Sequence, residues 1–191
     1  MNVTFTWETV CHTTVVIQNQ ILPNIYRIKL HFVTSTENVE EQRVSFEEVK
    51  MFFDQRVNLC SITCYETPEF DILKEYFEHT IMQIPGSEFS DLDVGYCLSR
   101  KVQKIIRKNL LLIGLEISSQ LGDNIEYILT PEDKVANSNA TWTDLKPWWD
   151  RPDFDINDLN KVDLDLTHVT QESKPERKPF VPVVIDGGKK D

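Results

Sequence analysis

Two neighbouring segments of the sequence, 4–17 and 24–34, are rich in β-branched residues and alternate in polarity. In the second segment the even positions carry the large apolar side chains Tyr26, Ile28, Leu30 and Phe32. Alternation with a period of two predicts strands that are buried on one face. Because a short connection separates the two segments, we expect them to pair as an antiparallel hairpin.

Three later segments show the apolar spacing of amphipathic helices. The first is expected to begin at Ser45, which stands three residues before Glu48 as in a capping box. The second is expected to start at Thr67, to end before Pro85, and to bury Phe70, Leu73, Phe77 and Ile81. The third, residues 91–108, ends in a basic stretch that includes Lys101 and Lys104, which we interpret as a solvated helix face.

The remaining apolar segments read as strands. Residues 110–119 and 123–130 predict a closing hairpin around Gly122 and Asp123. The stretch 54–66 between the first two helices predicts an extra strand. Strands at both ends of the chain with helices between them indicate an α+β fold.

Composition limits the functional classes. The chain has 191 residues and a formal net charge of −11, which disfavours binding to nucleic acid. It contains no apolar run of the length of a membrane span and no N-terminal signal-peptide pattern, so we expect a cytoplasmic protein that does not bind membranes. Four scattered cysteines do not form a disulfide framework and are expected to be reduced.

The composition shifts near Pro131, where proline, aspartate and polar residues take over. We therefore expect one domain over residues 1–132 and an extended acidic tail over residues 133–191. The tail places Trp148, Trp149 and Phe154 among aspartates, a composition typical of segments that fold onto a protein partner. The alternative is that Trp148 and Trp149 pack back onto their own domain.

Four stretches together resemble a known family. FTWETVCHT, LPNIYRIKLHFVT, RVSFEEVKMFF and LIGLEISSQLGDNIEY are similar to the first strand, second strand, first-helix entry and last hairpin of the 6-pyruvoyl-tetrahydropterin synthase and 6-carboxy-tetrahydropterin synthase family. The resemblance covers roughly residues 4–130. It implies the T-fold, a four-stranded antiparallel sheet with helices on one face, here with an inserted helix. It also implies a homo-oligomer whose subunits join through sheet edges, which would remove the exposed edges.

The resemblance also shows where this chain departs from the family. The three positions of the family's zinc-binding histidines are occupied here by Cys11, Leu22 and Asn24. Leucine cannot ligate zinc, and a catalytic zinc needs three protein ligands. On a regular strand His12 points away from Cys11, so the two side chains cannot chelate together. We therefore expect no metal, no cofactor and no catalytic residue, with Cys11 a small buried side chain.

Glu116 is the residue of the family's site that this chain retains. The family's glutamate binds the two N–H donors of the pterin, and the resemblance implies the same ligand-binding role for Glu116. The alternative is a solvated carboxylate on a strand.

Two functions remain. The first is a non-catalytic T-fold protein, a pseudoenzyme that acts by oligomeric assembly or by protein binding and that retains a pterin-like or purine-like pocket. The second is a pterin or deazapurine biosynthesis enzyme with a rebuilt active site.

Overall fold

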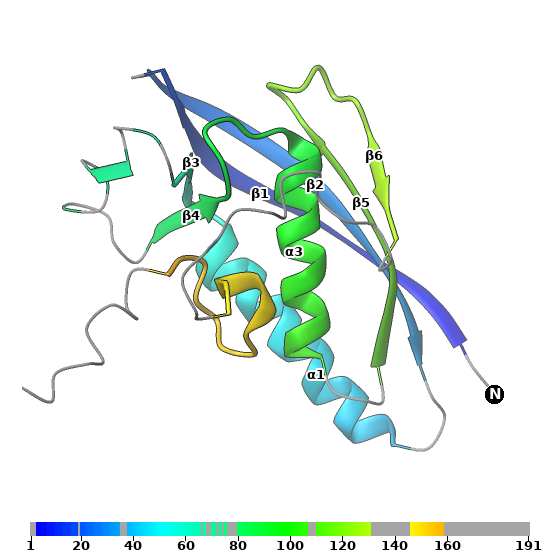
Figure 1. The fold of residues 1–191 in the computed structure, drawn as a ribbon. Coiled ribbons are helices and arrows are strands. Elements are labelled where there is room, and N and C mark those ends of the chain that lie inside the picture. Colours follow the sequence, from blue (N-terminus) through cyan, green and yellow to red (C-terminus); the bar gives the residue numbers. More distant parts are fainter. Residues whose placement is uncertain are drawn as a thin grey trace, which may run out of the picture. The chain divides into compact units, whose positions relative to one another are not determined.

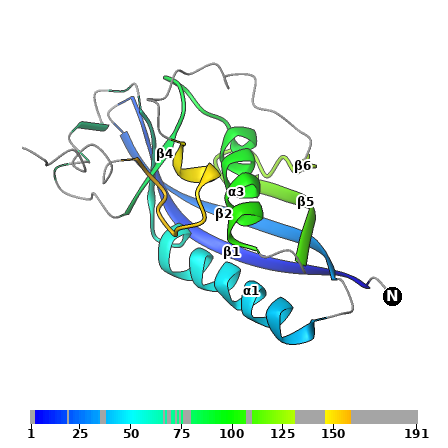
Figure 2. The same ribbon diagram turned by 60° about the horizontal axis from the view of Figure 1, so that its bottom comes forward.

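The structure is a computed structural model that describes residues 3–18, 20–34, 38–65, 67, 70–71, 73, 75, 80–106, 110–130 and 146–158. It is a mixed α+β fold in which one six-stranded sheet has the order β4-β3-β1-β2-β5-β6. Helices α1 (Val39–Phe52) and α3 (Asp91–Ile105) lie on one face of this sheet (Figure 1). No helix of the described residues covers the other face, which we call the open face (Figure 2).

The centre of the sheet is the hairpin that the alternating sequence predicts. Strands β1 (Val3–Ile17) and β2 (Gln20–Thr34) pair antiparallel over their whole length, with Cys11 opposite Tyr26. The even positions of β2 predicted to be apolar are buried beneath the helices. Strand β5 (Leu110–Ser119) pairs antiparallel with β2, and the short β6 (Tyr127–Leu129) pairs with β5. The predicted closing hairpin is therefore present.

The expectation of four strands needs correction. Strands β3 (Ser61–Cys64) and β4 (Ile81–Ile84) extend the sheet, and β3 pairs in parallel with β1 at Thr14 and Val15. Strand β3 falls within the stretch predicted to form an extra strand. Ile81, expected on the second helix, instead begins β4, because a short apolar run that is buried on all sides has no periodicity that distinguishes strand from helix.

Most of the predicted second helix lies outside the described residues, Phe77 among them. Phe70 and Leu73, expected on its inner side, are buried in a small cluster with Val16 and Ile81.

Helix α1 begins six residues before the expected start. Asn38 is its N-cap, and the side chain of Asn38 accepts a hydrogen bond from the backbone N–H of Glu41. Ser45 is fully buried inside the helix, so its spacing to Glu48 does not mark a cap. Asn38 and Ser45 are both residue types that favour an N-cap. The acidic first turn after Asn38 favours Asn38, because negative charges stabilise the positive end of the helix dipole. A π-helical turn, η1 (Phe53–Val57), continues α1 towards β3.

Helix α3 starts where the sequence predicts, with a capping box between Ser90 and Asp93. It approaches β5 and β6 closely at Gly95. A Cβ atom on that residue would stand 2.7 Å from Ile117 Cγ2 and 2.9 Å from Leu129 Cδ1. The absence of a side chain at Gly95 thus sets the distance between α3 and the sheet.

Residues 146–158, which we call the strap, fold back onto the domain (Figure 1). The strap contains a 3-10 turn, η3 (Trp148–Asp150), and lies against α3 and β4. Trp148 and Ile156 belong to the main hydrophobic core. The compact unit consequently runs to Lys161, whereas the sequence suggested an end at residue 132. No helix among the described residues is long and apolar enough to cross a membrane.

Candidate functional site

Cys11 and Asn24, two of the three positions that the resemblance relates to zinc ligands, have structural roles. The Cys11 side chain is 1 % exposed, and burial, followed by the charge of Asp54, raises the pKa of its thiol to about 12. The Asn24 side-chain oxygen accepts hydrogen bonds from the backbone N–H groups of Leu121 and Ile25, at 3.0 and 2.9 Å. The described residues contain no group of three or more His, Cys, Asp or Glu side chains arranged to hold a metal ion.

Glu116 lies on the open face of the sheet. Its carboxylate accepts a hydrogen bond from Lys29 Nζ at 2.8 Å, and it lies 2.7 Å from His31 Nε2. Lys29 also binds Glu126 at 2.9 Å, and His31 Nδ1 lies 2.9 Å from the hydroxyl of Thr6. The hydrogen bond from Lys29 is the main cause that lowers the pKa of Glu116. Glu116 is therefore a paired carboxylate in a polar cluster on a strand face.

The structure does not bring Glu116 together with the positions that resemble the metal site. Cys11 and Asn24 are buried on the helix-covered face, whereas Glu116 projects from the open face. Side chains on opposite faces of one sheet cannot line one pocket within a single subunit. His12 is exposed and Cys11 is buried, so these neighbours also point to opposite faces, as the strand periodicity predicts.

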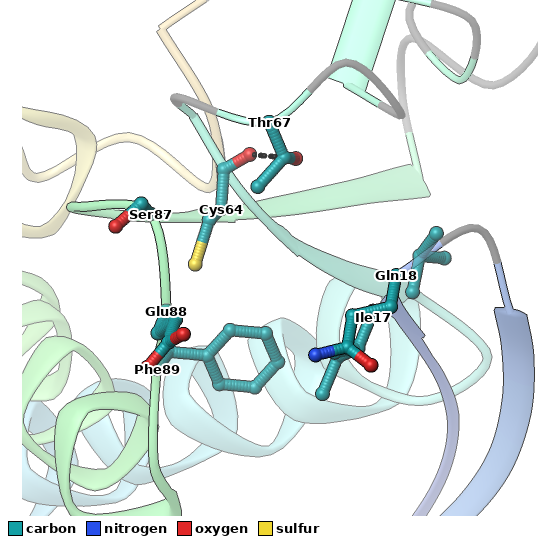
Figure 3. Close-up of a pocket in the computed structure, with 8 residues that line it drawn as sticks. Ile17, Gln18, Cys64, Thr67, Ser87, Glu88 and Phe89 are labelled. Atoms are coloured by element: carbon teal, nitrogen blue, oxygen red, sulfur yellow. Dashed lines mark hydrogen bonds between the residues drawn. The ribbon is translucent and has the colours of Figure 1, made fainter.

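Two adjoining cavities lie at the end of the sheet where β1 and β2 turn. The larger has a volume of about 430 Å³ and is lined by residues that include Ile17, Cys64, Thr67 and Phe89 (Figure 3). The Cys64 side chain points towards Phe89, and the Thr67 hydroxyl donates to the Cys64 carbonyl over 2.9 Å. The second cavity, about 220 Å³, shares Ile17 and Phe89 with the first.

The second cavity contains polar groups that sequence reasoning missed. It is lined by Asn24, Tyr26, Asp91 and Gly122, among others. Oδ2 of Asp91 is buried and has no hydrogen-bond partner among the described residues. Burial, the negative charge of Asp91 and a hydrogen bond between the two side chains raise the pKa of Tyr26 above its ordinary range. The sequence carries no signal for this, because an aspartate in the first turn of a helix is what capping alone predicts.

The strap is held by a buried lysine. Lys101, on α3, is 0 % exposed, and its Nζ donates to the carbonyls of Trp148 and Arg151 and to the Asp153 carboxylate, at 2.8, 3.2 and 3.0 Å. Burial lowers the pKa of Lys101 from 10.5 to about 8, although Asp153 acts in the opposite direction. The prediction that Lys101 belongs to a solvated basic face is wrong, because the strap covers it.

The tryptophans fill the space between α3 and β4. Trp148 is 0 % exposed, and its indole N–H donates to the carbonyl of Gln83 on β4 at 2.7 Å. Trp149 is 7 % exposed, and the Phe154 ring lies 6.0 Å from the Phe52 ring. The structure therefore shows the alternative arrangement, in which both tryptophans pack onto their own domain.

The acidic residues of the strap are paired. Arg151, 5 % exposed, binds Asp158, the carbonyl of Asn157 at 2.7 Å and Asp153 at 3.3 Å. Asp150 accepts from Arg100 on α3 at 2.7 Å. The expected extended, solvated segment is thus a folded one over residues 146–158, because cations of α3 and of the strap itself neutralise its aspartates.

Comparison with known proteins gives matches at the level of structure. No family model matches the sequence, and no curated protein matches it. A solved structure of an uncharacterized protein from Wolinella succinogenes is similar, with 8 % identity, a TM-score of 0.44, and coverage of 69 % of this chain and 99 % of that chain. Two catalytic-residue mutants of Plasmodium vivax 6-pyruvoyltetrahydropterin synthase have 10 and 8 % identity and TM-scores of 0.46 and 0.45, and each match covers 68 % of this chain and 97 % of that one.

Proposed function

We propose that this chain is a non-catalytic T-fold protein that acts by assembly, its copies joining through sheet edges. One observation carries the proposal: β3 and β6 are short, so the long strands β1 and β5 each have a stretch of edge with which no described strand pairs. β3 pairs with β1 at Thr14 and Val15, and Asn58 and Leu59 bind the backbone of His12, so among the described residues the β1 edge is open over residues 3–11. β6 pairs with β5 at residues 115–117, and no described strand pairs with the β5 edge at residues 110–113.

The side chains beside these edges support association. Leu111, Ile113 and Ile128 lie on the open face near the β5 edge and are 59, 39 and 71 % exposed. An open strand edge beside exposed apolar side chains is a surface on which another strand can pair. Cys11 and Asn24 are both buried, and the Asn24 side chain binds backbone N–H groups. These structural roles support the non-catalytic part of the proposal.

The hydrogen-bond geometry identifies which groups of β1 face outward. Thr14 donates its N–H to Cys60, and the His12 carbonyl accepts from Leu59, so these even positions point away from β2. The β1–β2 register is continuous, and alternation therefore directs the N–H of Glu8 to the open edge as well.

The test is a proline at that position. Glu8→Pro removes an outward N–H and places a ring on the edge, but it leaves the β1–β2 hydrogen bonds intact. We expect light scattering coupled to size exclusion to give a multiple of the chain mass for the wild type and for Glu8→Ala, and a lower mass for Glu8→Pro with an unchanged circular dichroism spectrum. A monomeric wild type at micromolar concentration would refute edge assembly.

The second candidate, a pterin or deazapurine enzyme with a rebuilt site, is favoured by the buried unpartnered Oδ2 of Asp91 in the smaller cavity. A carboxylate in such a position can accept two N–H donors from a flat heterocycle, the role that the resemblance assigns to Glu116. Thermal-shift titration with pterin tests both carboxylates. Loss of the shift in Asp91→Asn but not in Glu116→Gln would assign the ligand to the cavity, and the reverse would assign it to the open face. No shift in the wild type would remove this candidate.

A further inference from the structure

The two adjoining cavities at the end of the sheet have walls of one charge sign. Asp91 lines the smaller cavity, and Glu88 lines the larger one. None of the described residues that line either cavity is a lysine, an arginine or a histidine. The formal net charge of the whole chain, −11, acts in the same direction. Both cavities therefore favour a positively charged ligand over a neutral or a negative one.

The Asp91 carboxylate has one oxygen that no described residue serves. The Tyr26 hydroxyl donates to this carboxylate and accepts from the Asn24 amide, so the three side chains form one polar network. Oδ2 of Asp91 is nevertheless buried and lacks a donor among the described residues. A buried acceptor without a donor is unfavourable. A donor that reaches Oδ2 from the cavity would restore the missing hydrogen bond.

The backbone turn next to Asp91 does not supply that donor. The N–H of Gly122 donates to the Ser119 hydroxyl, and the N–H of Leu121 donates to the Asn24 side chain, each at 3.0 Å. A Cβ atom on Gly122 would collide with the Asp91 carboxylate. Glycine at this position thus lets the turn lie close against the carboxylate, while both N–H groups of the turn are already used.

The helix dipole does not cancel the preference for a cation. Asp91 stands in the first turn of α3, where the backbone contributes about half a unit of positive charge. The capping box of Ser90 and Asp93 already occupies that helix end. The full negative charge of Asp91 exceeds the half-charge of the helix, and Asp93 adds a second carboxylate to the same turn. The field at the smaller cavity is therefore negative.

Aromatic rings surround the carboxylate. Tyr26, Tyr127 and Phe89 line the smaller cavity, and Phe89 is also a wall of the larger one. Figure 3 shows the Phe89 ring among the side chains of the larger cavity, which at about 430 Å³ has the size of a ligand pocket. Aromatic faces attract cations and pack against flat apolar groups. The walls thus suit a cation that carries an apolar body.

We propose that the two cavities form a binding site for a small organic cation, an amine or an amidine on an apolar body. The charged end donates to the Asp91 carboxylate, and the body lies against Phe89 towards the larger cavity. This inference is independent of edge assembly. It differs from the pterin candidate because the ligand is recognised by its positive charge and not by the neutral N–H groups of a heterocycle.

Benzamidine and benzamide test the proposal, because they have the same shape and only benzamidine is charged. Each is titrated at constant ionic strength into the ¹⁵N-labelled full chain and followed by NMR. We expect saturable benzamidine shifts at the amides of Phe89, Asp91 and Gly122, with a Kd on the order of 1 mM or below. Benzamide should bind at least about tenfold more weakly. Equal binding of the two, saturable shifts only elsewhere, or no saturable benzamidine shift would overturn the proposal.

Asp91→Asn tests the carboxylate at nearly constant shape and should weaken benzamidine binding at least about tenfold. Asp93→Asn is the matched control, because it removes a carboxylate from the same helix turn but lies outside the residues that line the cavities. It should bind benzamidine nearly as the wild type does, and an equal loss in both variants would argue against contact with Asp91. The comparison of the two ligands uses the wild type alone, so it decides the question even if Asp91→Asn does not fold.

The outcome is also separable from the proposed functions. A pterin thermal shift that is lost in Asp91→Asn, without benzamidine binding, would overturn the cation site and leave the pterin candidate standing. The mass measured by light scattering bears on edge assembly and not on this site.

Discussion

The amine of Lys101 donates a hydrogen bond of 2.8 Å to the main-chain carbonyl of Trp148, 47 residues further along the chain. The lysine is fully buried, and the tryptophan whose carbonyl it binds is fully buried as well. A lysine is rarely buried without partners, because its charge has to be removed from water. This pair therefore indicates that the strap is part of the folded unit, and it leads to the first two predictions.

Lys101 should make the stability of the protein depend on pH in the alkaline range. Its folded-state pKa of about 8 lies below the ordinary 10.5, so between these values the unfolded chain binds more protons than the folded one. Stability from this group therefore rises with pH from about 8 to 10.5, by up to about 3 kcal/mol. The check is urea unfolding of the wild type and Lys101→Met from pH 7 to 10.5, because the difference between the two cancels the other titrating groups. A pH-independent difference would contradict the assignment.

Trp148→Ala should destabilise the protein strongly. The substitution removes a fully buried indole and leaves the Gln83 carbonyl without its donor. Tryptophan-to-alanine changes in a core cost about 3–5 kcal/mol. The melting midpoint of a chain of this length falls by about 2–4 °C per kcal/mol, so we expect a drop on the order of 10 °C. Val39→Ala, at a position 74 % exposed at the start of α1, is the control and should leave the midpoint nearly unchanged.

The cluster around Glu116 should contribute to stability at neutral pH and lose that contribution in acid. The pKa of Glu116 is lowered, chiefly by its hydrogen bond from Lys29, so the contribution is complete above the ordinary carboxyl value near 4.5 and disappears as pH falls through the folded-state value. A double-mutant cycle with Glu116→Gln and Lys29→Met should give a coupling of about 0.2–1 kcal/mol at pH 7. The same cycle at pH 3 should give a smaller coupling, and equal couplings would argue against the ion pair.

Gly122→Ala should destabilise the end of the sheet next to the smaller cavity. A Cβ on Gly122 would meet the Asp91 carboxylate, so either that carboxylate or the loop must move. Overpacking of this kind costs about 1–3 kcal/mol. Chemical denaturation measures the loss. The Asp91 carboxylate is the group that the new Cβ would contact, so Gly122→Ala should cost less in a protein that also carries Asp91→Ala. Additive effects of the two substitutions would mean that the loop backbone, and not the carboxylate, is the obstacle.

Chelation should not affect folding. Cys11, Leu22 and Asn24 stand where the family resemblance places zinc ligands, and Cys11 and Asn24 are buried in structural roles. The melting midpoint should therefore be the same with and without excess EDTA, within error. A loss of several degrees would reveal a metal site built from other residues.

Local patterns in the sequence were sufficient for much of the fold. Alternation along 4–17 and 24–34 predicts the central hairpin, and the amphipathic spacing of residues 91–108 predicts α3. Both predictions depend on neighbouring residues alone, through the periods of the strand and the helix. Where two local signals compete, as Asn38 and Ser45 do for the start of α1, the sequence does not say which one forms the cap.

The sequence by itself thus determined the α+β class, the central hairpin and the position of α3. Tertiary structure decided the rest, because burial is a property of residues that are distant in the chain. The run Ile81–Ile84 becomes a strand through its pairing with β3, and Lys101 becomes buried through a segment nearly fifty residues later. The same aspartates that look like a solvated tail are paired once Arg100, Lys101 and Arg151 lie beside them. Glu116 and Cys11 fall on opposite faces because strand order and register, rather than sequence spacing, set which side chains meet.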